Sequence, residues 1–117
     1  MKLVLVVEDN EDIREMAEMH LSLGGHACIS AENRNVAMEL IRKGLRPDLI
    51  LMDLMMYGMT IEEFNARMTS LGLEVPMILA TCSPDGERLA GKMGAYFLPK
   101  AYSSDDLMKT IDLCFKE

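Results

Sequence analysis

The sequence predicts a three-layer α/β fold, in which a five-stranded parallel sheet carries helices on both faces. Short apolar runs alternate five times with segments whose apolar residues recur at helical spacing. The first run, residues 2–7, is continuous and rich in valine, as in a strand that is buried on both faces. Because parallel strands need crossover connections, a strand–helix order repeated five times favours a parallel sheet.

Each expected strand is a short apolar run, and the second of them is the weakest in pattern. Pro47 precedes the third run, which ends in Asp53. The fifth run is followed closely by Pro99-Lys100. The strands are therefore expected at residues 2–7, 26–30, 48–53, 75–80 and 96–98.

The helices are predicted from apolar spacing and from residues suited to helix ends. Asn10 can cap the first helix, and Gly24-Gly25 can end it. Ser103 can cap the last helix, with Asp106 placed to complete a capping box. Segment 84–93 has only a weak helical pattern. The first, second, third and last helices each have a clear apolar face. In chain order, these faces are Ile13, Met16, Ala17, His20 and Leu21; Val36, Ala37, Leu40 and Ile41; Ile61, Phe64, Asn65, Met68 and Leu71; and Leu107, Met108, Ile111, Cys114 and Phe115.

Length and composition favour one acidic domain that spans residues 1–117. Half of the residues are hydrophobic, enough to build one core without disulfides or a structural metal. A net charge of −7 argues against a nucleic-acid surface, which needs clustered Lys and Arg. Three widely spaced cysteines favour a reducing compartment. With no signal peptide or membrane-spanning run in view, we expect a cytoplasmic protein without nucleic-acid or membrane partners.

Polar residues follow the ends of four predicted strands. Glu8 and Asp9 end the first strand, Asp53 ends the third, and Thr81 and Lys100 follow the fourth and fifth. Ligands in open α/β sheets bind beyond the carboxyl ends of the strands, so these side chains should share one site. Two carboxylates about 4 Å apart repel by roughly 4 kcal/mol at an effective dielectric constant of 20. A cation is therefore expected among them, and hard oxygen ligands suit Mg²⁺.

This set of residues also indicates phosphoryl chemistry. A carboxylate beside a metal ion can attack phosphorus and form an aspartyl phosphate. The hydroxyl of Thr81 and the ammonium of Lys100 could then bind the phosphoryl oxygens. Any one acid alone would be interpreted as a solvated loop residue or a helix cap. Together at the strand ends, the acids favour a site.

At this point the sequence resembles a response-regulator receiver domain, the phosphate-accepting module of two-component signalling. The resemblance covers the whole chain. It rests on LVLVVEDN, DLILMDLMM, MILATCS and GAYFLPKAY, in this order, and on the final helix. The family implies a flavodoxin-like (βα)5 sandwich with strand order 2-1-3-4-5. It implies no enzyme beyond self-directed phosphoryl transfer and autodephosphorylation.

The resemblance assigns roles to single residues. Asp53 matches the phosphoacceptor. Glu8 and Asp9 match the acidic pair that binds Mg²⁺, together with Asp53 and the backbone carbonyl of Met55. A second set matches the groups that bind phosphate and switch conformation: Lys100 for the phosphate, and Thr81 with Phe97 as the switch pair.

The implied partners are proteins. A histidine kinase or a phosphotransfer protein would supply the phosphoryl group from a phosphohistidine. An output domain or partner protein would bind the face formed by the fourth helix, the fifth strand and the fifth helix.

The sequence departs from the family pattern in two loops. Tyr57-Gly58-Met59-Thr60-Ile61 stands where Pro-Gly-Met-Asp-Gly is usual, and Ala101 stands where a cis proline usually follows the lysine. Since a cis bond without proline costs about 2.5–4 kcal/mol, we predict a trans Lys100–Ala101 bond in a rearranged loop. The spacing also leaves Tyr96 as an alternative to Phe97. Cys82 is expected to be a small buried hydrophobe.

Three other functions compete with a phosphoacceptor. A metal-dependent phosphatase would need its nucleophile on the first strand and a second acid two residues later, which Asp53-Leu54-Met55 does not supply. The two loop departures motivate a receiver-fold interaction module that phosphorylation does not regulate. A flavin or nucleotide site would need a Gly- or Ser/Thr-rich loop after the first strand. Glu8-Asp9-Asn10-Glu11 has the opposite electrostatic character.

Overall fold

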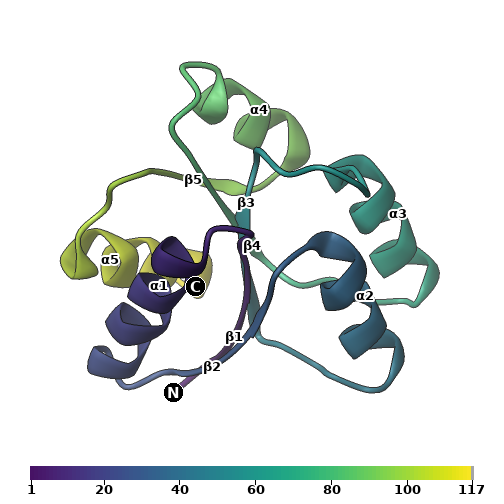
Figure 1. Cartoon of the computed structure of the whole chain (residues 1–117), viewed down its shortest axis with the longest axis horizontal. Coiled ribbons are helices and arrows are strands. Elements are labelled where there is room, and N and C mark those ends of the chain that lie inside the picture. Colours follow the sequence, from purple (N-terminus) through teal and green to yellow (C-terminus); the bar gives the residue numbers. More distant parts are fainter. Residues whose placement is uncertain (117) are drawn as a thin grey trace.

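A computed structural model describes residues 1–116 and shows one parallel sheet covered on both faces (Figure 1). The five strands lie in the order β2-β1-β3-β4-β5, and all four neighbouring pairs are parallel. The predicted fold class and strand order are therefore confirmed. The strands are β1 (Leu3–Val7), β2 (Ala27–Ala31), β3 (Leu49–Asp53), β4 (Met77–Thr81) and β5 (Tyr96–Pro99).

The helices divide into two groups, one on each face of the sheet (Figure 1). Buried residues of α1 and α5 pack with one set of strand side chains, and those of α2, α3 and α4 pack with the other set. None of the helices within residues 1–116 has both the length and the apolar character to cross a bilayer. The helices are α1 (Glu11–Leu23), α2 (Arg34–Arg42), α3 (Ile61–Ser70), α4 (Gly86–Met93) and α5 (Ser104–Cys114).

Side-chain caps fix where the helices begin. Asn10 Oδ1 accepts a hydrogen bond from the Ile13 amide, as the sequence predicts. Ser103 and Asp106 form the predicted capping box at the start of α5. The cap of α2 is Asn33, so this helix starts earlier than its apolar pattern alone indicates.

Several strand boundaries differ from prediction by one or two residues. The fourth strand begins at Met77, because Pro76 has no N–H to donate to the sheet. It ends at Thr81, so this residue belongs to the strand. The backbone N–H of Lys2 bonds to His26 Nδ1 at 3.1 Å, beside the start of the β1–β2 pairing.

The middle of the sheet is the core of the molecule. Every residue of β3 and β4 is buried, and their side chains alternate between the two helical layers. Phe64 of α3 is a large side chain with no exposed surface in the layer of α2, α3 and α4. Two packed layers hold the central strands rigid, and so fix the positions of the residues at their carboxyl ends.

We predict that Phe64→Ala lowers the free energy of unfolding by about 3–5 kcal/mol, because it leaves a cavity in this layer. Tyr57→Ala is the matched control. That ring is 96% exposed, so its loss should change stability by less than about 0.5 kcal/mol. Urea titrations followed by circular dichroism measure both variants. Equal effects of the two substitutions would contradict the packing described above.

Candidate functional site

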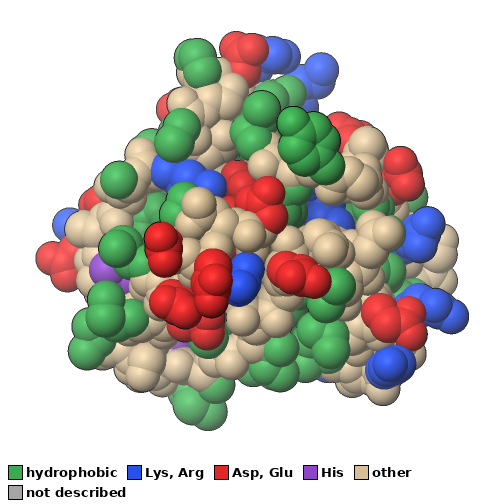
Figure 2. All heavy atoms as spheres, viewed as in Figure 1, with side chains coloured by type: hydrophobic (Ala, Val, Ile, Leu, Met, Phe, Trp, Pro, Cys, Tyr) green, Lys and Arg blue, Asp and Glu red, His purple; other side chains and the backbone are tan. Residues whose placement is uncertain are grey.

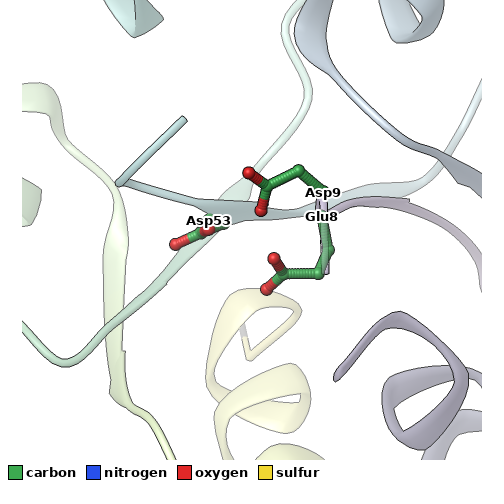
Figure 3. A group of neighbouring side chains, drawn as sticks. All are labelled: Glu8, Asp9 and Asp53. Atoms are coloured by element: carbon green, nitrogen blue, oxygen red, sulfur yellow. The ribbon is translucent and has the colours of Figure 1, made fainter. Parts of the chain in front are cut away.

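Three carboxylates meet at the carboxyl end of the sheet. Glu8 and Asp9 follow β1, and Asp53 is the last residue of the neighbouring strand β3. One oxygen from each of the three residues lies within 4.8 Å of the others. Figure 3 shows the Asp9 and Glu8 carboxylates on opposite sides of the chain, with the Asp53 carboxylate at a height between them. The cluster follows from the register, which pairs Val7 with Met52 and so brings the two strand ends together.

A buried ammonium lies against this cluster. Lys100 Nζ is 2.7 Å from Glu8 Oε1 and 3.2 Å from Asp53 Oδ1, and its side chain is only 13% exposed. Residues 1–116 contain no cis peptide bond, so the Lys100–Ala101 bond is trans as predicted. The trans bond nevertheless leaves Lys100 at the site, where it neutralises part of the negative charge.

Burial and charge shift the ionisation of these groups. Burial raises the pKa of Glu8 above its ordinary value, and the nearby charge of Asp53 raises it further, against the opposing hydrogen bonds from Lys100 and Asn10. Burial alone would lower the pKa of Lys100, but the hydrogen bond to Glu8 and the charge of Asp53 raise it overall. The rise in the pKa of Glu8 thus comes mainly from burial, whereas the rise in the pKa of Lys100 comes from its two carboxylate partners.

The donor atoms present fit a hard divalent cation. All three side chains offer carboxylate oxygens, and Mg²⁺ prefers oxygen ligands. Both Glu8 oxygens accept hydrogen bonds, from Lys100 and from the Asn10 amide. Asp53 Oδ1 accepts from the Met55 amide and forms an ion pair with Lys100, whereas Oδ2 accepts no hydrogen bond within the described residues. Asp9 is exposed, so one side of the cluster is open to solvent.

Thr81 and Phe97 pack together on the other side of the sheet from Lys100. Thr81 is buried, and its Oγ1 accepts a hydrogen bond from the Ser83 amide at 3.0 Å. Gly86 packs against both residues so closely that a Cβ there would overlap the Thr81 methyl group and the Phe97 ring. Phe97, not Tyr96, is therefore the aromatic ring beside Thr81. Its role as a switch residue stays a prediction.

Two other predictions near the site have different outcomes. The Met55 amide donates to Asp53 Oδ1 at 3.2 Å, so this residue does lie at the site. The metal-binding role of its carbonyl stays a prediction. The expectation that Cys82 is buried is wrong. Strand β4 ends at Thr81, and Cys82 is exposed in the connection that follows.

The sequence analysis did not identify Arg34, which is buried directly behind Asp53. Its guanidinium donates to the carbonyls of Asp53, Leu54 and Met59 at 2.8, 3.0 and 3.0 Å. Its Nε lies 3.1 Å from Met52 Sδ. A weak signal was present in the sequence: Arg34 directly precedes a predicted helix, where a cation lies at the unfavourable end of the helix dipole.

The surface around the site is acidic but includes an apolar pocket. Figure 2 shows acidic side chains gathered near the middle of the viewed face, with basic side chains against them. A mostly apolar pocket of about 280 Å³ lies beside Lys100 and is lined by Ile13 and Met16 of α1, Cys82 and Ala101. A macromolecular partner that approaches the carboxylates would meet this apolar surface.

Comparison with known sequences gives one family. A family model described as the response regulator receiver domain matches residues 4–112. The phosphate regulon transcriptional regulatory protein PhoB of Pseudomonas aeruginosa is 32% identical over 112 residues, which are 92% of this chain and 48% of PhoB. Response regulator MprA of Mycolicibacterium vanbaalenii is 32% identical over 108 residues, 90% of this chain and 46% of MprA. The chain thus spans about half the length of these curated relatives.

Solved structures have the same fold over almost the whole chain. The Francisella response regulator 1452 receiver domain superposes with a TM-score of 0.84 at 22% identity, over 99% of this chain and 98% of that one. Chemotaxis protein CheY4 of Vibrio cholerae gives 0.84 at 28% identity, over 98% and 99%. Response regulator TrrA of Thermotoga maritima, solved in complex with Mg²⁺ and BeF, gives 0.83 at 25% identity, over 98% and 100%.

We predict that Lys100→Met lowers the free energy of unfolding of the metal-free chain by about 3 kcal/mol at pH 7, because it leaves buried carboxylates without their cation. Lys43→Met is the control, since Lys43 makes only an exposed pair with Glu39 and should contribute less than about 1 kcal/mol.

The contribution of Lys100 to the free energy of unfolding should also depend on pH. Because folding raises the pKa of Lys100, its contribution is fully present below the ordinary value of 10.5 and is lost as pH rises through the raised value. Denaturant titrations in EDTA at several pH values measure the difference. Equal stability of the Lys100 and Lys43 variants at pH 7 would rule out this account of the charge balance.

Proposed function

Because the chain belongs to the response regulator receiver domain family, we propose that it accepts a phosphoryl group on Asp53, with Mg²⁺ as cofactor, within two-component signalling. One observation carries the proposal: Asp53 lies within one cluster with Glu8 and Asp9, and Lys100, which directly follows β5, contacts it. A carboxylate nucleophile, acidic metal ligands and a phosphate-binding cation are the three parts that this reaction needs.

The residues divide the chemistry among them. Asp53 Oδ2, which accepts no hydrogen bond within the described residues, attacks phosphorus. A carboxylate–phosphorus bond forms, and the bond from phosphorus to the donor's imidazole nitrogen breaks. Lys100 exchanges its ion pair with Asp53 for contacts with the phosphoryl oxygens, and Glu8 holds it in place at 2.7 Å. Bound through Glu8, Asp9, Asp53 and the Met55 carbonyl, Mg²⁺ would supply positive charge for the phosphoryl oxygens.

We propose that the chain is not an enzyme toward other substrates. Its chemistry is confined to its own carboxylate, which is phosphorylated and then loses the phosphoryl group to water. The exposed carboxylate of Asp9 and the solvent-open side of the cluster are compatible with such hydrolysis.

Phosphorylation would act on the sheet edge through Thr81 and Phe97. It adds about −1.5 to −2 units of charge at Asp53. The Thr81 hydroxyl would exchange the Ser83 amide for a phosphoryl oxygen, and the Phe97 ring packed against Thr81 would follow. The surface of α4, β5 and α5 is the proposed binding face for an output domain or partner protein.

The proposed donor is a histidine kinase or a phosphotransfer protein. The apolar pocket beside Lys100 supports contact with a protein at this end of the sheet. Relatives about twice as long, one of them titled a transcriptional regulatory protein, support an output domain as partner. A cytoplasmic location fits the three free cysteines.

We predict that acetyl phosphate with Mg²⁺ adds one phosphoryl group to the wild-type chain and none to Asp53→Asn, measured by intact mass. Glu62→Gln is the control, since this acid lies on α3 outside the cluster and should leave the adduct unchanged. An adduct on Asp53→Asn would refute the assignment of Asp53. No adduct on the wild-type chain would favour an interaction module that phosphorylation does not regulate.

We predict that Gly86→Ala uncouples the switch pair from Asp53, because the new methyl group would displace the Thr81 methyl and the Phe97 ring. The shift of the Phe97 ring signals on addition of beryllofluoride should fall to less than about half of the wild-type shift. Gly91→Ala is the control, since a Cβ there meets nothing within 4 Å. An unchanged Phe97 response in Gly86→Ala would show that this packing plays no part in switching.

A further inference from the structure

Arg34 contacts both ends of the loop that carries the phosphoacceptor. At the start of the loop its guanidinium holds the carbonyls of Asp53 and Leu54, and at the end it holds that of Met59. The fork of one side chain therefore closes a loop of several residues onto the end of β3. Planar guanidinium groups suit such multiple acceptors because their donors are held in fixed directions.

The middle of the loop is held less firmly than its ends. Met55 and Tyr57 in its middle are exposed, 69% and 96%, and Gly58 has a positive φ of 91°. A pocket of about 180 Å³ lies beside it, lined in part by Arg34, Leu54 and Met56. Leu54, Met56 and Met59 do pack against the core, but the exposed stretch between them has no such contacts, so the hydrogen bonds of Arg34 add a constraint at both ends of the loop.

The position of Arg34 is costly unless it has a specific role. Only 2% of its surface is exposed, and it stands in the first turn of α2, where the helix dipole disfavours a cation. No acidic residue in that first turn offsets its charge. Its partners are instead backbone carbonyls. Burial lowers the pKa of Arg34, and the charges of Asp53, Glu62 and Asp9 offset that only in part.

We propose that Arg34 is a positioning residue, which fixes the backbone from Asp53 to Met59 so that the Asp53 carboxylate and the Met55 backbone face the acidic cluster. It touches no metal or phosphate and acts through the loop. The metal-related part rests on the proposed function, whereas the effect on loop order in the metal-free chain does not.

The first test measures hydrogen exchange of the Leu54 and Met55 amides by NMR in the metal-free chain. Arg34→Met removes the donors and the charge, and Arg34→Lys keeps the charge but loses the fork. Both should accelerate exchange of these amides by about tenfold or more relative to Met38→Ala, a buried substitution on the same helix, compared at equal global stability. Exchange in Arg34→Lys equal to wild type would overturn the proposal, as would acceleration no greater than in Met38→Ala.

The second test uses the wild-type chain alone and so does not depend on a variant that folds. A guanidinium held by three carbonyls should give separate, slowly exchanging Nη proton signals for Arg34. A single averaged signal, as in a freely rotating guanidinium, would overturn the proposal.

The third test measures Mg²⁺ affinity by calorimetry. Both Arg34 variants should bind Mg²⁺ about 10–100-fold more weakly than wild type, the usual effect of losing a residue that orients metal ligands, while Met38→Ala should bind normally. Unchanged affinity in the Arg34 variants would overturn the metal-related part. If the wild-type chain itself binds no Mg²⁺, the proposed function fails, and the first two tests still decide the role of Arg34 in loop order.

Discussion

The site depends on one electrostatic constraint: three carboxylates are held close together with a single ammonium among them. The register of β1 against β3 imposes the arrangement, since it fixes the ends of two adjacent buried strands. Neither strand can slip without turning its buried side chains to the wrong helical layer. The repulsion between acids is therefore sustained by the core, and Lys100 relieves only part of it. A divalent cation would relieve the remainder.

The surroundings of Glu8 show how the fold accommodates a buried acid. Both of its carboxylate oxygens are occupied, one by Lys100 and the other by the Asn10 amide, and Arg14 Nη1 donates to its carbonyl at 2.9 Å. Asn10 in turn caps α1. The start of this helix and the position of Glu8 are thus set by the same few hydrogen bonds, which leaves Asp9 and Asp53 as the carboxylates with more freedom to meet a ligand.

The sequence predicts the fold and the acid cluster well because both follow from periodicity. Alternating runs indicate a parallel sheet, the family resemblance implies the strand order, and the strand ends place Glu8, Asp53 and Lys100 at one edge. Loops follow different rules. Cys82 was expected inside but lies outside, since exposure after a strand depends on how the chain turns. Arg34 was missed because it binds backbone carbonyls at the end of a neighbouring strand and in the loop after it. Every residue has a carbonyl, so no pattern of residue types reveals which ones act as its acceptors.

Two buried cations approach Asp53 from opposite faces of the sheet, and their partners differ in kind. Lys100 contacts carboxylate oxygens, which change their charge and their ligands during phosphoryl transfer. A point charge with rotatable donors can exchange such partners. Arg34 contacts backbone carbonyls, whose charge does not change, through a rigid fork. Exchanging the two residues would reverse this division, with a rigid donor where the ligands change and an adaptable one where the backbone must stay fixed. A lysine therefore suits the face with the carboxylates, and an arginine suits the face with the backbone carbonyls.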